Sequence, residues 1–398
     1  YHHLLLAADG NSLLLGQWPP GDAIMFVPTS YSLGLVMALG ALCCWGSWSA
    51  TLILASEVMP FQLYYMNFTL SFLVTGFVVG FIGGTFGSGG EAYDFSTPYL
   101  DEICGVGHAG VCYLWAISGG VVWNCANILL CKGIGMMGNA VGFPLCVGLG
   151  MVAGAVVAYV QDPQSNLAFL VPGVIVALAA ISTVGLLSAR KDQEMQRRAN
   201  YASSDESEVE GTTSQETDGS ADCGEQAAKP PSASMLRKLV VCITGGLLLG
   251  LSNIGVGKAT SSPCLLSPYA NQTYFSLGVF ITSLVLLPLI TACPIEGGLG
   301  TNFGPILRKY GTMPLKCHLL AVLGGFILCA GFFFFNLGNK STNLTISYCI
   351  GQSAPLVGIL WGTFFFKEFA GTTPRVWGLV PVVCVLFASA IALIAAAG

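Results

Sequence analysis

Charged side chains are scarce in this sequence: Asp, Glu, Lys and Arg together make up only 9% of its 398 residues. Soluble globular domains carry about a quarter of such residues, so the composition excludes an ordinary soluble protein. Apolar runs of about 20 residues, the length that crosses a bilayer as a helix, recur along the whole chain. The sequence therefore predicts a protein whose bulk lies within a membrane.

Patterns that support catalysis or metal binding are also missing. The sequence has only four His, no CxxC pair and no His cluster at ligand spacing. No GxxxxGK[ST] nucleotide-binding run occurs, and no His or acid at the middle of a predicted span could activate a nucleophile. We therefore expect no metal, no cofactor, no nucleic-acid partner and no enzymatic activity.

The expected fold is all-α, because a backbone in lipid must satisfy its own hydrogen bonds. Segments of about ten alternating residues, which would indicate a transmembrane barrel, are absent. Ten transmembrane helices are predicted from the apolar runs and the Gly, Pro and charged residues between them. They lie near 31–55, 61–84, 111–132, 138–160, 167–189, 239–258, 272–293, 317–337, 345–366 and 376–397.

Basic residues predict the orientation of these helices. With the N-terminus outside, thirteen of the fifteen Lys and Arg fall in inner loops, as the positive-inside rule requires. The glycosylation sequons that begin at Asn271, Asn339 and Asn343 then fall in outer loops. Both termini are expected outside or in a lumen, and the membrane is the plasma membrane or an endomembrane.

The chain divides into four segments with an internal repeat. We expect an outer segment at 1–30, five helices in 31–189, a disordered acidic Ser-rich cytosolic linker at 190–236, and five helices in 237–398. A shift of 205 residues lays GGVVWNCANILLCKGIG at 119–135 on GGFILCAGFFFFNLGNK at 324–340. Because each half has an odd number of spans, the second half enters the membrane upside down. Such inverted repeats are typical of transporters that bind substrate between the repeats near the midplane.

Three cysteines, Cys104, Cys112 and Cys264, fall on the predicted outer side. A disulfide persists in such an oxidising environment, so one bridge among the three is expected. The sequence leaves their pairing open. Most other cysteines lie in or beside spans and are expected to act as small apolar residues.

Several motifs, in order along the chain, resemble a known family. ALCCWGSWSATLILA at 41–55, FQLYYMNF at 61–68, GGVVWNCANILL at 119–130, AVGFPLCVGLGMVAG at 140–154 and ISYCIGQSAPLVGILWGTFFFKEF at 346–369 look like the ureide permease branch of the drug/metabolite transporter superfamily. The resemblance implies two inverted five-helix repeats and alternating access. It also implies uptake of ureides such as allantoin, or of nucleobases such as uracil and xanthine, usually driven by protons. The neighbouring glucose/ribose porters carry sugars.

The sequence departs from that family at Asn67. Relatives commonly carry an acid there, and bacterial members often carry another where this chain has Gln62. Because an amide cannot take up and release a proton, the departure puts proton coupling in doubt.

Polar residues within the ninth span predict a substrate site. On a helix Tyr348, Gln352 and Pro355 share one face, and Pro355 removes the hydrogen bond to the carbonyl of Gly351. Freed backbone is tolerated at this depth where it lines a cavity. A neutral amide beside a weakened helix suits an uncharged polar solute, although Gln352 could instead join helices together.

Other spans supply further candidates. Asn124 and Asn127 share a face of the third span, and their amides match the alternating N–H and C=O groups of a ureide or pyrimidine. Trp45 and Trp48 share a face of the first span, where a flat ring could stack on them. For all four residues, packing between helices is the alternative. The weaker candidates for substrate contact are Ser47, Ser252, Asn253 and Asn67.

The charged candidates lie near span ends. Glu57 is a candidate for a gate or proton relay. Glu368, at the predicted cytosolic rim, and Pro355 are further candidates for gating or coupling. The hypothesis is a secondary transporter of a small uncharged polar solute, with substrate and membrane lipid as partners and a homodimer left open. Two alternatives remain: a sugar porter, and a receptor or scaffold that binds without transport.

Overall fold

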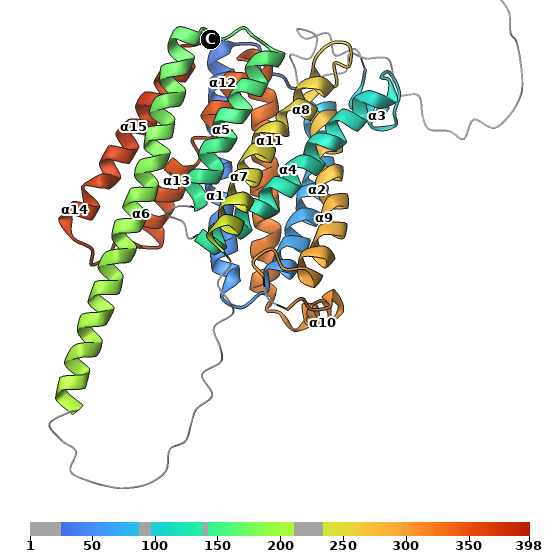
Figure 1. Ribbon diagram of the computed structural model, residues 1–398. Coiled ribbons are helices and arrows are strands. Elements are labelled where there is room, and N and C mark those ends of the chain that lie inside the picture. Colours follow the sequence, from blue (N-terminus) through green and yellow to red (C-terminus); the bar gives the residue numbers. More distant parts are fainter. Residues whose placement is uncertain (1–24, 87–96, 138–141, 211–233, 298) are drawn as a thin grey trace, which may run out of the picture.

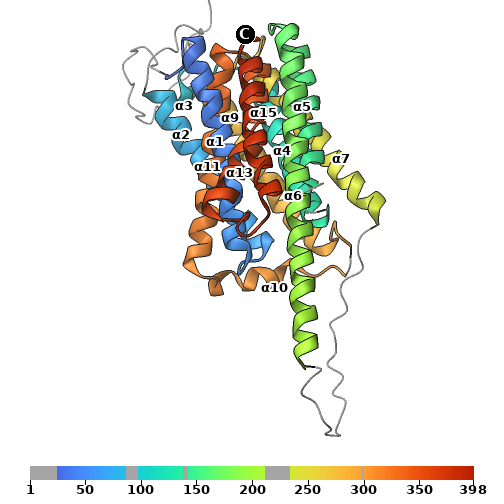
Figure 2. The same cartoon turned by 90° about the vertical axis from the view of Figure 1, so that its left-hand side faces the viewer.

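The computed structural model describes residues 25–86, 97–137, 142–210, 234–297 and 299–398, which form a bundle of α-helices (Figures 1 and 2). Within these residues, nine helical stretches are long and apolar enough to cross a membrane. The chain is therefore a multi-pass membrane protein. The continuous ones include α1 (Tyr31–Ser56), α2 (Phe61–Thr85), α4 (Gly110–Met137), α9 (Pro268–Ala292) and α11 (Leu315–Ser341).

The remaining long helices complete the bundle. The predicted span 138–160 corresponds to α5 (Gly142–Gln161), whose apolar part, Leu145–Gln161, is shorter than the other nine stretches. Helix α6 (Leu167–Glu210) packs against α15 (Leu379–Ala395), which follows the short α14 (Pro374–Trp377). In Figure 1, α6 extends well beyond the rest of the bundle.

Two spans are interrupted near their middle. Helix α7 (Met235–Leu251) gives way at Ser252 to α8 (Asn253–Thr260). Helix α12 (Leu344–Gly351) ends before α13 (Pro355–Leu360), and a π-helical turn, η3 (Trp361–Phe365), follows. The break between α12 and α13 lies where Pro355 predicts it. The break at Ser252 was not predicted, because 239–258 was expected to be one continuous span.

Helix starts follow ordinary capping chemistry. The side chains of Ser30, Ser234 and Ser267 accept hydrogen bonds from backbone N–H groups of the first turns of α1, α7 and α9. Pro60 and Pro314 directly precede α2 and α11. These local signals explain why the predicted and observed starts of most spans agree closely.

The two ends of the bundle differ. A disulfide joins Cys112 at the start of α4 to Cys264, which follows α8, and this end, here called the disulfide end, also carries α3 (Tyr99–Ile103) and the C-terminus (Figure 1). The opposite end, here called the α10 end, carries α10 (Phe303–Arg308) and η2 (Tyr310–Thr312). Cys104 is an exposed free thiol, so the structure resolves the pairing that the sequence left open.

One of the predicted segment boundaries needs correction. Helix α6 does not end near residue 189 but continues to Glu210, because residues 190–210 are rich in Ala, Glu, Gln, Lys and Arg, which favour helix even outside the membrane. The rest of the predicted linker, 211–233, lies outside the described residues. Most of the predicted segment 1–30 lies outside them too, but Met25 and Val27 are buried and Phe26 hydrogen-bonds to Gly83 and Tyr269.

Two of the three predicted glycosylation sites are also wrong. Asn271 lies in the first turn of α9, not in a loop, and is fully buried with its amide donating to Asn336. Asn343 caps α12, is 4% exposed and accepts from the N–H of Ile346. A glycan needs an exposed asparagine side chain. Asn339, half-buried in the last turn of α11, stays a prediction.

Candidate functional site

A cavity of about 750 Å³ occupies the middle of the bundle and extends to the α10 end. Its walls come from both halves of the chain: α1, α4, α5 and α6 on one side, and α7, α8, α11 and the interrupted helix α12–α13 on the other. At the α10 end the lining includes the exposed residues Ser56, Glu57 and Glu368. The cavity is therefore reached from the α10 end.

Most of the predicted polar residues line this cavity. They are Asn127, Ser252, Asn253, Tyr348 and Gln352, together with Pro355 at the helix interruption. They come from three spans that are far apart in the sequence, and the fold brings them together around one cavity. The interruptions of two spans place Ser252, Asn253 and Gln352 directly at breaks in the helical backbone.

Several polar atoms of the cavity have no protein partner. Among the described residues, the buried Nδ2 of Asn253 and Nε1 of Trp45 have no hydrogen-bond acceptor. The side-chain amide of Gln352, a residue 8% exposed, likewise makes no hydrogen bond within the part of the chain that the structure describes. Unsatisfied polar groups are costly in a buried site, so these groups are available to a polar solute.

Other polar groups of the site are already engaged. The Tyr348 hydroxyl donates to the carbonyl of Gly150 at 2.9 Å, and the Ser252 hydroxyl donates to that of Leu249 at 2.7 Å. An added Cβ at Gly154 would lie 2.2 Å from the ring of Tyr348, so the glycine makes room for that ring. Tyr348 therefore contributes a wall and not a free hydroxyl.

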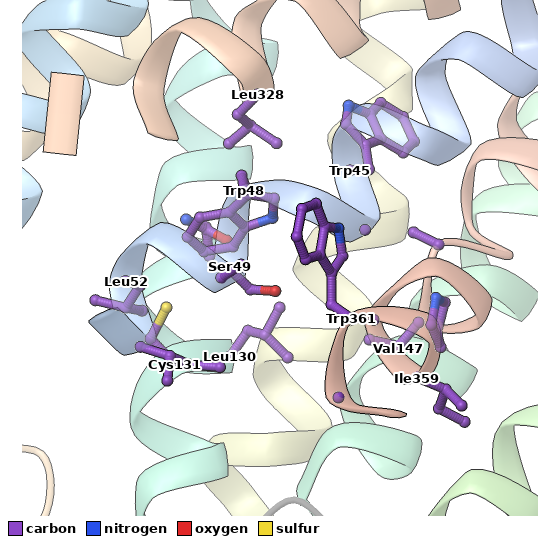
Figure 3. Close-up of a pocket in the computed structure, with 18 of the residues that line it drawn as sticks. Trp45, Trp48, Ser49, Leu52, Leu130, Cys131, Val147, Leu328, Ile359 and Trp361 are labelled. Atoms are coloured by element: carbon purple, nitrogen blue, oxygen red, sulfur yellow. The ribbon is translucent and has the colours of Figure 1, made fainter. Parts of the chain in front are cut away.

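Aromatic rings form much of the wall. Figure 3 shows the indoles of Trp45, Trp48 and Trp361 gathered around one space. Trp45 packs against Phe332 and Phe335, with ring centroids 5.0 and 5.6 Å apart. Flat apolar faces beside free amide groups can hold a planar polar ring by stacking and hydrogen bonding together.

The two predicted amides of the third span have different places. Asn127 lines the cavity, but Asn124 does not and is fully buried behind it. The Tyr65 hydroxyl joins them, because it donates to Asn124 Oδ1 at 2.8 Å and accepts from Asn127 Nδ2 at 2.9 Å. Asn124 in turn donates to Ser283 at 2.9 Å. The predicted direct contact between Asn124 and substrate is therefore corrected to a positioning role.

Asn67 and Ser47 also lie outside the cavity lining. Asn67 is near the α10 end, where its amide bonds to His318 Nδ1 at 2.9 Å and accepts from the Tyr310 hydroxyl at 2.6 Å. Ser47 accepts from the indole N–H of Trp361 at 2.9 Å. The structure thus assigns both residues to contacts between elements, and Ser47 to orienting an aromatic wall of the site.

The charged residues of the lining stand at its mouth. Among the described residues that line the cavity, Glu57 and Glu368 are the only charged ones. Glu368 pairs with Lys191 of α6 at 2.7 Å, and Glu57 directly follows α1. The deep part of the cavity is consequently polar but uncharged.

The cavity is closed toward the disulfide end. Phe72, Trp123, Phe275 and Phe332, from α2, α4, α9 and α11, pack ring against ring, with Phe275 and Phe332 centroids 4.9 Å apart. Beyond this aromatic plug, amides of α9 and α11 bond to one another: Asn271 donates to Asn336, and Asn336 donates to Gln272.

Some residues of the site were not anticipated. Trp123, Phe332, Phe335 and Trp361 line the cavity, and Tyr65 supports it from behind. The internal repeat could have pointed to two of them, since the shift of 205 residues pairs Phe332 with Asn127 and Phe335 with Leu130.

Comparison with known proteins gives a similarity over almost the whole chain. No protein-family model matches the chain. Over 408 aligned residues, 23% are identical to "Ureide permease 4" of Arabidopsis thaliana, an alignment that covers 94% of this chain and 98% of that protein. The chain is similar to a ureide permease. This near-full-length similarity, with the apolar helical bundle, supports a multi-pass membrane transporter of ureide permease-like type.

Proposed function

We propose that this protein is a secondary transporter that carries a small uncharged polar solute of the ureide or nucleobase type, such as allantoin, uracil or xanthine. The observation that carries the proposal is the central cavity, which offers free donors from Trp45, Asn253 and Gln352 between aromatic walls. Its deep part has no charged side chain among the described lining residues, which favours an uncharged solute. The match to a ureide permease gives independent support.

The helix bounds support two repeats of five helices. Moved by 205 residues, α1 covers 236–261, where α7 and α8 together span Met235–Thr260. The same shift lays α4 on 315–342, where α11 spans Leu315–Ser341. Helix packing repeats too: α4 contacts α7 and α9 as α11 contacts α1 and α2. Because α1 begins at the disulfide end and α8 ends there, the halves run in opposite directions, so we propose ten spans in inverted repeats.

The cavity itself lies between these repeats. The shift pairs lining residues with lining residues: Trp48 with Asn253, Asn127 with Phe332, and Val147 with Gln352. In each pair one member is an amide and the other is aromatic or aliphatic. A flat solute held here therefore meets a hydrogen-bonding group on one side and an apolar surface on the other.

This arrangement supports alternating access. The cavity reaches the α10 end, while the aromatic plug and the α9–α11 amides close the disulfide end. If the aromatic plug opened and the mouth around Glu57, Glu368 and Pro355 closed, the same site would be exposed to the disulfide end. The Lys191–Glu368 ion pair, beside the mouth, is our proposed inner gate. We place proton coupling on Glu57, a lining carboxyl group with no ion pair among the described residues.

Uptake of radiolabelled allantoin tests the proposal, in yeast lacking its own ureide and nucleobase permeases. We expect saturable uptake that unlabelled uracil and xanthine reduce and glucose does not. Gln352→Ala and Asn127→Ala each remove a hydrogen bond of about 1–1.5 kcal/mol, so we expect roughly 10-fold weaker apparent affinity. Asn302→Ala removes an exposed amide at the start of α10 and should leave uptake unchanged.

Surface delivery of every variant is measured alongside uptake. Inhibition by glucose in place of the heterocycles would replace the ureide assignment with a sugar porter. Binding of allantoin without flux would indicate a receptor. Wild-type affinity in both cavity variants would show that the solute binds elsewhere.

A further inference from the structure

A second cavity, of about 350 Å³, lies at the side of the bundle between α6 and α14. It is lined by Arg190, Gln193, Glu194, Arg197, Arg375 and Val376, and it shares no lining residue with the central cavity. Figure 1 shows α6, with α14 and α15 beside it, at the edge of the bundle. A function at this cavity is therefore separate from solute binding.

The second cavity carries an excess of positive charge. Arg190, Glu194 and Arg197 lie at i, i+4 and i+7 and so share one face of α6, and Arg375 faces them from α14. All three arginines are exposed, and no acceptor within the described part of the chain bonds to their guanidinium groups. Three cations and one carboxylate leave a net charge of plus two.

The carboxylate of Glu194 is held by the protein. The backbone N–H of Thr373 donates to it at 2.9 Å, and the Thr373 hydroxyl donates to its other oxygen at 2.5 Å. These bonds fix the loop before α14 against α6 and so fix the position of Arg375. Three arginines from two elements held in fixed relation thus line one cavity.

The surroundings place this cavity at the depth of lipid phosphates. Leu186, one turn before Arg190 on α6, is 57% exposed, and Val382 of α15 is 46% exposed, so an apolar surface directly adjoins the arginines. Trp377, 42% exposed beside Arg375, donates its indole N–H to Phe369. Exposed Trp beside basic residues is typical of the membrane interface.

We propose that this cavity binds the headgroup of an anionic phospholipid that carries a phosphate monoester, with its acyl chains along α6 and α15. Guanidinium groups bind phosphate oxygens in pairs of parallel hydrogen bonds, and basic pockets between helices hold such headgroups at a cytosolic membrane surface. The doubly charged monoester matches the net charge of plus two. A zwitterionic lipid does not.

Native mass spectrometry of the purified full chain tests this assignment, with dioleoyl phosphatidate as the probe and dioleoyl phosphatidylcholine as the comparison lipid. We expect wild-type protein to hold one phosphatidate at least 10-fold more tightly than phosphatidylcholine. The triple variant Arg190→Gln/Arg197→Gln/Arg375→Gln should lose that preference. The triple variant Arg308→Gln/Lys309→Gln/Lys316→Gln removes three exposed cations from the same end of the bundle and should keep it.

Equal losses in the two triple variants would show a diffuse charge effect and overturn the site. Soluble glycerol 3-phosphate bound as tightly as phosphatidate would show a free-anion site and overturn the lipid assignment. Because a triple variant can fail to fold, Arg375→Gln alone provides a milder change, with an expected loss of about threefold or more in phosphatidate affinity. Unchanged affinity in Arg375→Gln with unchanged thermal stability would also refute the proposal.

Discussion

Glu102 is a buried carboxyl group at the disulfide end, 1% exposed. It accepts hydrogen bonds from the backbone and the hydroxyl of Ser267, and His108 Nε2 lies 3.1 Å from it. Burial raises the pKa of Glu102 above its ordinary value of 4.5, although the bonds from Ser267 and the nearby His108 oppose the shift. This group links α3 to the start of α9, so its protonation affects the packing of that end.

The raised pKa predicts a pH-dependent stability. The folded protein binds the Glu102 proton more tightly than the unfolded chain, so this stabilising contribution is complete below pH 4.5 and is lost as the pH rises through the raised pKa. A tenfold difference in proton affinity between the folded and unfolded states corresponds to about 1.4 kcal/mol of stability. We expect the melting temperature of Glu102→Gln to fall less over this interval than that of the wild type. Asp101→Asn, which changes an exposed neighbour, should keep the wild-type slope, and an identical slope in Glu102→Gln would contradict the assignment.

The cavity residues show how far single residues could be predicted. Gln352, Asn127 and Asn253 could be predicted as site residues because an amide within an apolar span is costly unless it has a hydrogen-bond partner. All three line the cavity. Asn124 has the same chemistry and the same helix face, yet Tyr65 takes its carbonyl oxygen. Because Tyr65 also accepts a hydrogen bond from Asn127, the two amides differ only in that Asn127 reaches the cavity. That difference depends on how α4 packs against its neighbours, and helix periodicity carries no such information.

At the scale of elements, two helix crossings depend on glycines that the repeat relates to each other. An added Cβ at Gly120 of α4 would lie 2.0 Å from the carbonyl oxygen of Phe275 in α9. At Gly325 of α11 it would lie 2.2 Å from the carbonyl oxygen of Phe68 in α2. Backbone cannot yield as a flexible side chain can, so the crossings are close because these residues lack a Cβ.

Alanine at either glycine should therefore force the crossing apart. We expect Gly120→Ala and Gly325→Ala each to destabilise the protein by about 1–3 kcal/mol, measured as a lower melting temperature in size-exclusion thermostability assays. Gly148→Ala is the matched control, since its Cβ would meet Leu178 at an ordinary 3.5 Å. Equal stability of all three variants would show that the helices are packed less closely than the structure indicates.

Most helices could be predicted from the sequence, but interruptions and extensions only in part. The lengths of the apolar runs and the capping residues indicate where most spans begin and end, and Pro355 marks the break before α13. Ser252 breaks α7 from α8 without a proline, so composition gave no sign. In α6 the charged residues after Arg190 form helix to Glu210, because local helix propensity does not stop where hydrophobicity does.

At the scale of the whole molecule, charge is segregated between the two ends. Lys132 pairs with Glu296, Arg237 donates to Pro294, and Lys191 pairs with Glu368, all toward the α10 end. Arg308 and Lys309 lie on the surface of that end. Lys340, by contrast, donates to Thr260 at the disulfide end. By the positive-inside rule, we propose that the α10 end faces the cytosol, an orientation in which the central cavity is open inward.

Two exposed thiols allow this orientation to be measured. Cys104 lies at the disulfide end and Cys293 directly follows α9 toward the α10 end, so a membrane-impermeant maleimide should label Cys104 in intact cells and Cys293 only after permeabilisation. Cys104→Ser should abolish the first signal and Cys293→Ser should reduce the second. Cys43 is also exposed but lies within the α1 span, where lipid excludes a charged reagent. Labelling of Cys293 in intact cells would reverse the orientation, and the cavity would then be open to the outside.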